Sequence, residues 1–229
     1  MKVVILQPSY VPWRGYFHQV QKADLFVLYD DVQYDDRGWR NRNRIKTAQG
    51  SRWLTIPVRS KGAQRDAIPI DRIAIDWSQD WARKHLSTLR HAYAGAPHLE
   101  RYHALLAEHL GRRPALLADL TCELTIALAR ELGLGTRFLR SSTLGVSGAK
   151  TERLLEVLVR VGATRYISGP SARDYLDVPL LEASGISVEF MRYDYPEYPQ
   201  LHPPFDPRVS ILDLLVTHGP DGGRFIWGA

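Results

Sequence analysis

The stretch VVILQPSYVPWRGYFHQVQKADLFVLYDDV, residues 3–32, decides the fold. It opens with an apolar run bounded by Pro8, which is typical of a buried strand, and LFVLYDDV at residues 25–32 repeats that pattern. Between them, GYFHQVQKAD at residues 15–24 has the length of one helix. Two strands joined through a helix form a parallel pair with a right-handed crossover, so this stretch predicts an α/β sheet.

The rest of the chain alternates between strand and helix patterns. Short β-rich runs at residues 52–58 and 72–76 predict further strands. Apolar residues then recur at helical spacing over residues 78–93, 98–110 and 114–134, with Gly95, Gly111 and Gly133 as termination signals. Strand and helix patterns alternate again over residues 137–195, and a last helix at residues 209–219 has Ser210 as its N-cap.

These patterns predict an α/β protein with a mainly parallel sheet in a Rossmann-like or HUP-like layout. The middle of the chain adds a helical insertion. We expect residues 1–77 and 136–229 to form the α/β core and residues 78–135 to form an insertion packed on that core. A chain of 229 residues is long enough for this arrangement.

Composition and charge limit the classes of partner. The formal net charge of +5 favours phosphate-bearing substrates or an acidic carrier protein. Scattered arginines without a zinc-finger, RRM or helix-turn-helix signature argue against nucleic acid. The lone Cys122 fits a reducing compartment, and no apolar run approaches the roughly 18–20 residues that span a bilayer. We therefore expect a cytoplasmic protein with no membrane span and no nucleic-acid partner.

The first candidate binding loop is QPSYVPWRGYF, residues 7–17. It follows a predicted strand and opens a helix, and ligands of parallel sheets bind beyond the carboxyl ends of strands. Backbone N–H groups at the start of that helix, near Gly15, would suit a phosphate or carboxylate. Packing of the aromatic residues in the core is the alternative. The substrate-binding candidates here are Gln7, Tyr10, Trp13 and Tyr16.

The second candidate segment is YDDVQYDDRGWRNRNRI, residues 29–45. Asp30 and Asp31 follow an apolar strand, so they are expected at its carboxyl end, where they would line the main pocket. Carboxylates there would serve as a general base, hold a metal or bind a hydroxyl, and Arg captures anions in a bidentate manner. Structural ion pairs between these acids and the following arginines are the alternative. The further candidates in this segment are Gln33, Arg42 and Asn43.

The third candidate segment is RYISGPSARDYLD, residues 165–177, where a predicted strand runs into a turn with exposed amides and hydroxyls. In a parallel sheet this turn would open onto the same edge as the first two segments. Its binding candidates are Ser168, Ser171 and Tyr175.

Two histidines and one glutamine complete the candidate set. His202 and Gln200 lie in the aromatic loop YPEYPQLHPPF, residues 195–205, and His85 lies on the helix expected near residue 78. Histidine transfers protons near neutral pH, and a packing role is the alternative for each of these side chains. Cys122 lies in a strongly apolar helix, where an inert buried thiol is expected.

Seven stretches occur in a fixed order along the chain: QPSYVPWRGYF, DLFVLYDDVQY, GWRNRNRI, WLTIPV, KTERLLEVL, YISGPSARDYL and YPQLHPPFDPRVSILDLL. Together they resemble the WbqC-like protein family from end to end. The opening also resembles pantothenate synthetase and the HIGH-motif nucleotidyltransferases in layout. Where those enzymes carry His-x-Gly-His, this chain has Trp13-Arg14-Gly15-Tyr16, which argues against adenylyl transfer.

The family resemblance implies a transferase that takes part in the biosynthesis of O-antigen or another surface polysaccharide, or in secondary metabolism. The expected reaction is acyl or aminoacyl transfer to an amino sugar, with Asp31, His85 and His202 as candidate catalytic residues. The expected partners are a nucleotide-linked sugar and an acyl or aminoacyl carrier protein. A nucleotidyltransferase-like enzyme and a non-catalytic binding module for a nucleotide sugar or carrier protein are the alternatives. The sequence identifies no cofactor and no metal-binding motif.

Overall fold

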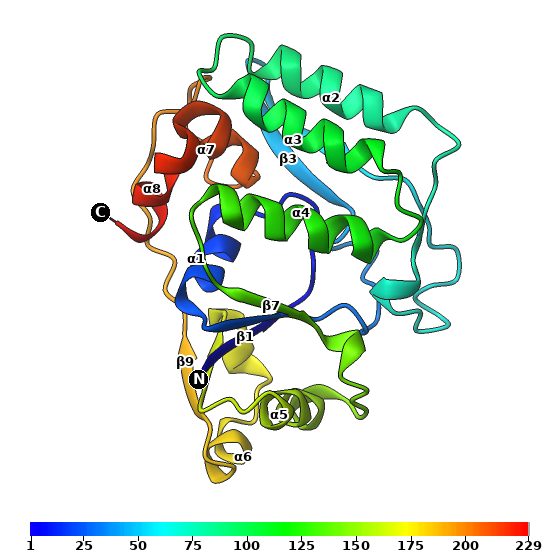
Figure 1. Cartoon of the computed structure of the whole chain (residues 1–229), viewed down its shortest axis with the longest axis vertical. Coiled ribbons are helices and arrows are strands. Elements are labelled where there is room, and N and C mark those ends of the chain that lie inside the picture. Colours follow the sequence, from blue (N-terminus) through cyan, green and yellow to red (C-terminus); the bar gives the residue numbers. More distant parts are fainter. Residues whose placement is uncertain (229) are drawn as a thin grey trace.

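The centre of the molecule is a five-stranded parallel sheet with the strand order β7-β2-β1-β8-β9 (Figure 1). The computed structural model describes residues 1–228. The predicted α/β class and parallel sheet are confirmed, because every neighbouring pair in this sheet is parallel. The strands are β1 (Lys2–Leu6), β2 (Leu25–Leu28), β7 (Arg137–Arg140), β8 (Arg165–Ser168) and β9 (Ser187–Phe190).

Apolar side chains alternate between the two faces of the sheet. Along β1, Val4 belongs to a hydrophobic cluster with Phe17 of helix α1 (Arg14–Lys22). Val3 and Ile5 belong to a second cluster on the other face, which contains Val157 of helix α5 (Lys150–Arg160). Helices therefore cover both faces, as buried parallel strands require.

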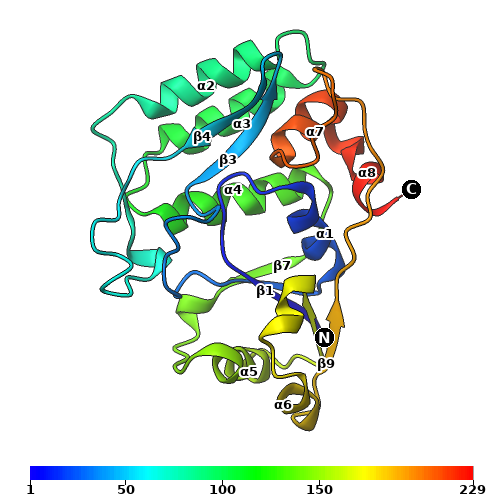
Figure 2. The same cartoon turned by 180° about the vertical axis from the view of Figure 1, so that it is seen from behind.

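The segment between β2 and β7 contains the three helices predicted as an insertion. Helices α2 (Trp81–Ala92), α3 (Leu99–Gly111) and α4 (Leu117–Glu131) lie on the α1 side of the sheet (Figures 1 and 2). Residues of all three share one hydrophobic cluster with Val4 and Phe26 of the sheet. The division into a core and a separate insertion stays a prediction.

The two runs predicted as strands after residue 50 form outside the central sheet. Strand β4 (Gly50–Thr55) pairs antiparallel with β3 (Arg42–Thr47), and β5 (Val58–Arg59) pairs antiparallel with β6 (Ala74–Ile75). The polar strand β3 was not predicted from the sequence, although its first residues alternate between arginine and smaller or apolar side chains. Asn43 and Ile45 are buried, whereas Arg42 and Arg44, which alternate with them, are more exposed.

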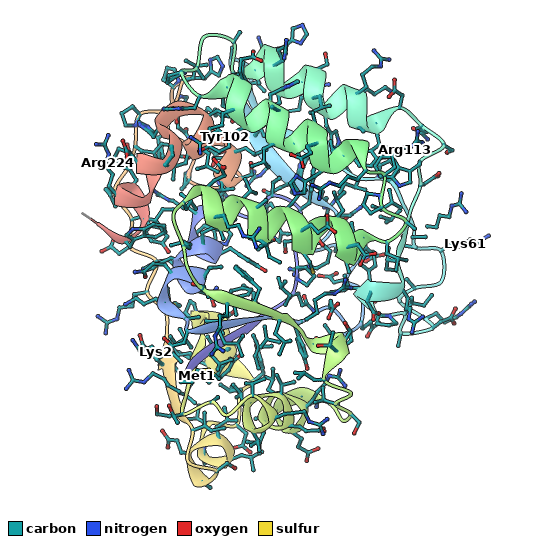
Figure 3. All side chains as sticks on the ribbon, viewed as in Figure 1. Met1, Lys2, Lys61, Tyr102, Arg113 and Arg224 are labelled. Atoms are coloured by element: carbon teal, nitrogen blue, oxygen red, sulfur yellow. The ribbon has the colours of Figure 1, made fainter. Side chains whose placement is uncertain are left out.

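The remaining elements are short helices and 3-10 turns. Ser210 precedes helix α7 (Ile211–His218) as expected, but its side chain makes no capping hydrogen bond. Figure 3 shows how densely side chains fill the space between the layers. Among residues 1–228, no helix combines the length and the apolar character needed to cross a membrane. The elements not yet named are η1 (Ile70–Arg72), η2 (Ser141–Thr143), η3 (Pro170–Asp174), α6 (Val178–Ala183), η4 (Gly219–Gly223) and α8 (Arg224–Trp227).

Candidate functional site

The strand order creates a crevice at the carboxyl edge of the sheet. The chain proceeds from β1 through β2 to β7 on one side, and then returns to the other side of β1 with β8 and β9. Connections therefore leave β1 and β8 in opposite directions, and such a switch point is the usual ligand site of an open α/β sheet.

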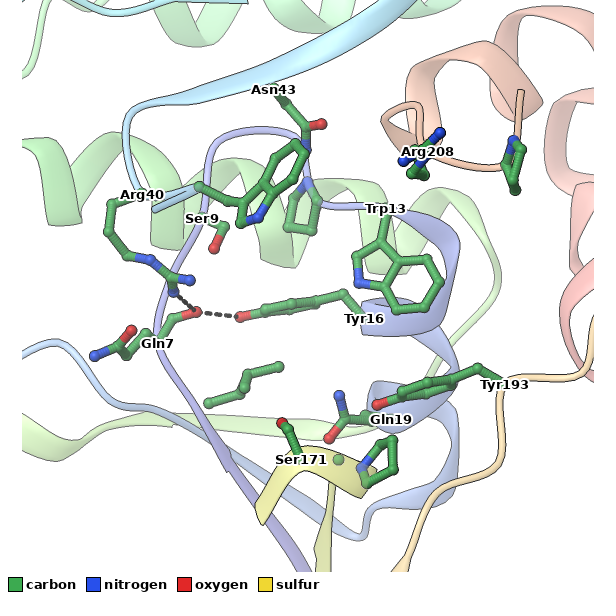
Figure 4. Close-up of a pocket in the computed structure, with 16 residues that line it drawn as sticks. Gln7, Ser9, Trp13, Tyr16, Gln19, Arg40, Asn43, Ser171, Tyr193 and Arg208 are labelled. Carbon is green, nitrogen blue, oxygen red and sulfur yellow. Dashed lines mark hydrogen bonds between the residues drawn. The ribbon is translucent and has the colours of Figure 1, made fainter. Parts of the chain in front are cut away.

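A cavity of about 500 Å³ lies at this switch point (Figure 4). Residues that follow β1 and β8 form part of its wall. The segment at residues 39–43, which leads into β3, and the C-terminal loop between β9 and α7 complete it. Its volume falls within the range typical of small-molecule sites. The lining residues are Leu6, Gln7, Ser9, Pro12, Trp13, Tyr16, Gln19, Trp39, Arg40, Asn43, Gly169, Pro170, Ser171, Tyr193, Pro207 and Arg208.

The loop after β1 is braced by the segment before β3. The backbone N–H of Tyr10 donates to the carbonyl oxygen of Arg40 at 3.1 Å. Asn43 Nδ2 donates to the carbonyl oxygens of Tyr10 and Val11 at 3.2 and 2.9 Å. Val11 is fully buried and has a φ of 38°, a conformation that a β-branched residue rarely adopts. The bracing therefore holds a strained backbone at the cavity wall.

Arg40 supplies a positive charge to the cavity. Its Nη1 donates to the carbonyl oxygens of Gln7 and Pro8 at 3.1 and 3.4 Å, and its Nε is buried without a partner. Burial lowers the pKa of the Arg40 guanidinium, although arginine stays protonated in proteins. In the part of the chain that the structure describes, no carboxylate lies within ion-pair distance of Arg40.

Arg208 supplies a second positive charge, from an exposed position on the C-terminal loop. It forms no ion pair with any carboxylate in residues 1–228. In Figure 4, Arg40 and Arg208 project from opposite sides of the cavity. Both positive charges therefore line the same cavity.

Aromatic rings provide much of the apolar wall. Trp13 and Tyr193 pack edge to face with ring centroids 5.0 Å apart, and Trp13 and Trp39 are 36% and 42% exposed. Burial raises the pKa of Tyr193 to about 12, so its hydroxyl is neutral at physiological pH. The Tyr16 hydroxyl donates to the carbonyl oxygen of Gln7 at 3.4 Å. These rings suit a flat or apolar part of a ligand.

At Gly15, where the sequence predicts an anion beside the helix start, the Trp13 ring crowds one side of the first turn of α1. The indole of Trp13 packs directly beside Gly15, so that a Cβ at this position would overlap the ring. The charged side chains that line the cavity are Arg40 and Arg208.

Five of the residues predicted from the sequence line the cavity, namely Gln7, Trp13, Tyr16, Asn43 and Ser171. The lining residues that were not predicted from the sequence include Ser9, Gln19, Trp39, Arg40, Tyr193 and Arg208. Trp39 and Arg40 lie in the GWRNRNRI stretch, close to the predicted candidates Arg42 and Asn43. Their position in the sequence could therefore have identified them. Arg208 and Tyr193 come from loops whose position depends on tertiary packing.

Asp30 and Asp31, expected beside the cavity, take part in ion pairs on the other side of β2. Arg140 Nε contacts Asp30 at 2.5 Å and Arg153 Nη2 contacts Asp31 at 2.7 Å. The Ser142 backbone N–H also donates to Asp30 at 3.0 Å. The end of β2 adjoins β7, whereas the cavity opens between β1 and β8. The ion-pair alternative therefore describes both carboxylates, with arginines that lie later in the chain than expected.

The two candidate catalytic histidines also lie outside the cavity lining. His85 is buried and shares a hydrogen bond of 3.1 Å with the hydroxyl of Tyr10, and burial lowers its pKa to about 4. His202 Nε2 donates to the carbonyl oxygen of Ala92 at 2.6 Å, within the loop packing. Both side chains thus have structural partners.

The remaining predicted binding residues form hydrogen bonds outside the cavity or are exposed away from its lining. Gln33 donates to Gln64 at 3.0 Å, Arg42 Nη2 donates to the carbonyl oxygen of Arg37 at 2.8 Å, and Gln200 donates to that of Asp206 at 3.0 Å. Ser168 is buried and donates to the Tyr166 hydroxyl at 3.2 Å, and Tyr175 is 67% exposed. Tyr10, Asp30, Asp31, Gln33, Arg42, His85, Ser168, Tyr175, Gln200 and His202 are absent from the cavity lining.

The cavity lining has a distinct chemical character. Within residues 1–228, its charged members are Arg40 and Arg208, and it contains no carboxylate, imidazole or thiol. Gln7, Ser9, Gln19 and Ser171 offer neutral donors and acceptors. No group of three or more His, Cys, Asp or Glu side chains in the described chain is arranged to hold a metal ion. The lining suits an anionic ligand that also carries neutral polar groups and a ring.

Comparison with known proteins places this architecture in a family. The chain is 40% identical over 227 residues to the uncharacterized protein Rv1507c of Mycobacterium tuberculosis (strain ATCC 25618 / H37Rv), covering 98% of this chain and 97% of the relative. A search of solved structures gave no significant match. The model of the WbqC-like protein family matches residues 7–225, which include every cavity residue except Leu6. The chain therefore belongs to the WbqC-like protein family.

Proposed function

We propose that this chain is a cytoplasmic biosynthetic transferase that binds a nucleotide-linked sugar in the switch-point cavity. The observation that carries the proposal is the pair of arginines, Arg40 and Arg208, which line the cavity without carboxylate partners. Arg matches the geometry of phosphate oxygens, and a diphosphate offers two charged groups to two guanidinium groups.

The other lining residues support the same ligand class. Trp13 and Trp39 offer partly exposed indoles to a base or sugar ring, and Gln7 and Gln19 offer amides to hydroxyl or acylamino groups. The cavity of about 500 Å³ has the size of a site for such a ligand. The position at the switch point agrees with the place where nucleotides bind in other open parallel sheets.

The reaction proposed is acyl or aminoacyl transfer to the amino group of that sugar, in surface-polysaccharide or related biosynthesis. The sugar nitrogen attacks the carbonyl carbon of a thioester donor, and a C–N bond forms. The C–S bond breaks, its electron pair leaves on sulfur, and a proton from nitrogen ends on the departing thiol. Arg40 and Arg208 would hold the diphosphate and fix the position of the amine, which is the positioning part of catalysis.

Calorimetry with UDP-N-acetylglucosamine tests the binding site. Arg40→Gln and Arg208→Gln should each weaken binding by about ten- to a hundredfold, the range of a lost charge-assisted hydrogen bond of about 1.5–3 kcal/mol. Arg52→Gln is the matched control, since Arg52 is exposed on β4 and absent from the cavity lining. Absence of binding by the unaltered protein, or an equal loss in Arg52→Gln, would refute the proposed site.

A non-catalytic module that binds a nucleotide-linked sugar is the second candidate function. It is favoured by the missing carboxylate, imidazole and thiol in the cavity lining of residues 1–228. Mass spectrometry of UDP-glucosamine incubated with the protein and acetyl-coenzyme A, or with an acyl carrier protein loaded by the same acyl group, separates the two. An acylated sugar supports the transferase, whereas tight binding without product from either donor supports the module.

A further inference from the structure

The outer face of the β3–β4 hairpin carries arginine and tryptophan side chains. Arg42 and Arg44 of β3 lie on this face, whereas the residue that follows each of them is buried. Arg44 is directly opposite Trp53 of β4 in the antiparallel register, so their side chains share that face. Trp53 is 45% exposed. In Figure 2 the hairpin lies in front of helices α2 and α3, and its outer face is therefore open to a partner.

These side chains stack on one another and reach the rim of the cavity. The guanidinium carbon of Arg42 lies 5.0 Å from the ring centroid of Trp53. That of Arg44 lies 5.4 Å from the centroid of Trp53 and 5.7 Å from that of Trp39. The two indole rings are 5.2 Å apart, and Trp39 also lines the cavity. Trp39, Arg42, Arg44 and Trp53 thus form one surface, called here the Arg–Trp face, which begins at the cavity.

The Arg–Trp face is positively charged. Within residues 1–228, neither Arg42 nor Arg44 forms an ion pair with a carboxylate. Asp206 lies near Arg44, but it accepts hydrogen bonds from the Ser51 hydroxyl and from a backbone N–H. Residues 35–46 contain five Arg or Lys residues and two Asp residues. The guanidinium groups of this face are therefore available to carboxylates of another molecule.

Resting on the proposed function, we propose that the Arg–Trp face is the docking surface of an acidic carrier protein that holds the thioester donor. Trp and Arg dominate the binding energy of protein interfaces more often than other residues. Arginine also binds carboxylates in a bidentate manner, so an acidic surface is the complement of this face. A carrier protein holds its acyl group on a flexible arm, and docking at this face would place that arm beside Trp39, at the rim of the cavity.

The same features disfavour other occupants. A second copy of this chain, docked by the same face, would bring arginines against arginines. Single-stranded nucleic acid binds in a continuous basic groove, whereas Asp35, Asp36 and Asp206 lie near the arginines of this face. Small molecules such as coenzyme A bind in concave sites, whereas Arg42 and Trp53 lie on the outer face of a two-stranded sheet and outside the cavity lining.

The direct test is fluorescence anisotropy with a labelled acyl carrier protein that is loaded with an acetyl group. Arg42→Glu should weaken its binding at least tenfold, and Trp53→Ser should act in the same direction. Arg52→Glu is the matched control, because Arg52 is on the same hairpin but opposite the buried Ile45, so its side chain does not belong to the Arg–Trp face. Thermal denaturation and calorimetry with UDP-N-acetylglucosamine should show that each variant is folded and that its cavity is unaltered.

Turnover measures the same surface independently. Transfer to UDP-glucosamine is followed from two donors, the loaded carrier protein and S-acetylpantetheine, which has the reactive part of the arm without the protein. Arg42→Glu should raise the KM for the carrier protein at least tenfold and leave kcat/KM for S-acetylpantetheine unchanged. Added salt should also raise the KM for the carrier protein, because it screens charges on exposed surfaces.

The outcomes separate this inference from the function on which it rests. Failure of the unaltered protein to bind the carrier, or an equal loss in Arg52→Glu, would overturn the docking face. Tighter binding of a single-stranded oligonucleotide than of the carrier would overturn it too, as would an equal loss of acetyl-coenzyme A turnover in Arg42→Glu. Each of these results leaves the proposed cavity site intact as long as UDP-N-acetylglucosamine binds. Absence of UDP-N-acetylglucosamine binding would contradict the proposed function itself.

Discussion

Asn43 holds Val11 in place: its Nδ2 donates a hydrogen bond of 2.9 Å to the carbonyl oxygen of Val11, whose φ is 38°. The same amide group donates to the Tyr10 carbonyl at 3.2 Å, and Asn43 itself lines the cavity. A strained backbone of this kind costs on the order of 1–3 kcal/mol and persists only where its surroundings enforce it. The shape of the cavity wall therefore depends on a side chain of the β3 strand.

Asn43→Ala should lower both stability and ligand affinity. It leaves two carbonyl oxygens of the strained loop without their donor, and we expect a loss of about 1–3 kcal/mol in the free energy of unfolding. Affinity for UDP-N-acetylglucosamine should fall about tenfold or more as the loop relaxes. Asn41→Ala is the control, since Asn41 donates to the Ile56 carbonyl and lies outside the cavity lining. Equal affinity losses in both variants would argue against a positioning role for Asn43.

Gly15→Ala should weaken binding with little effect on stability. The added methyl group displaces the Trp13 indole, which lines the cavity, while Ala in place of Gly favours a helix by about 1 kcal/mol. Titration calorimetry and thermal denaturation on the same variant measure the two effects. Gly111→Ala, at a helical position with open space around it, should leave affinity unchanged. Unchanged affinity in Gly15→Ala would mean that Trp13 does not contact the ligand.

Asp30→Ala should destabilise the protein without affecting the cavity. Asp30 is fully buried and accepts hydrogen bonds from Arg140, Ser141 and Ser142. Removing one partner of a buried ion pair costs about 3–5 kcal/mol. Urea denaturation should detect this loss, while affinity for UDP-N-acetylglucosamine in the folded fraction stays within about twofold. A large loss of affinity in the folded Asp30→Ala protein would show that Asp30 takes part in ligand binding.

Acid should destabilise the protein partly through His85. Burial lowers the pKa of this imidazole to about 4 in the folded state, whereas the unfolded value is about 6.5. Above pH 6.5 His85 is neutral in both states and has no effect. As pH falls from about 6.5 to 4, the unfolded state binds the proton first, so the free energy of unfolding falls by up to about 3 kcal/mol.

The difference between the unaltered protein and His85→Gln isolates this term. The stability of both proteins should be followed by urea denaturation over that pH range. The gap between them should narrow as the pH falls, because only the unaltered protein carries the imidazole. A gap that is independent of pH would show that His85 titrates normally.

Cys122→Ser should preserve ligand binding. The thiol is buried in α4, and burial raises its pKa to about 12, so no thiolate forms near neutral pH. A disulfide reagent should label Cys122 only after unfolding. Loss of UDP-N-acetylglucosamine binding or of turnover in Cys122→Ser, with unchanged thermal stability, would count against this view.

The sequence by itself determined that the protein has a parallel α/β sheet and which loops lie at the carboxyl edge of that sheet. Apolar runs at β1, β2 and β8 are long enough to be buried strands, and a helix between parallel strands places their carboxyl ends at one edge. Gln7 and Ser171 were therefore expected at the same edge, and both line the cavity. These features can be predicted because the apolar pattern of a strand and the length of a connection depend on residues that are close together in the sequence.

Tertiary structure alone decided where along that edge the cavity opens and which charges reach it. Hydrophobic periodicity specifies which face of a strand is buried but not which strand becomes its neighbour. The sequence could not tell that β2 adjoins β7, which removes Asp30 from the cavity and pairs it with Arg140. Nor could it tell that Arg40 and Arg208 line one cavity, because this depends on how the segment before β3 and the loop between β9 and α7 pack around the switch point of the sheet.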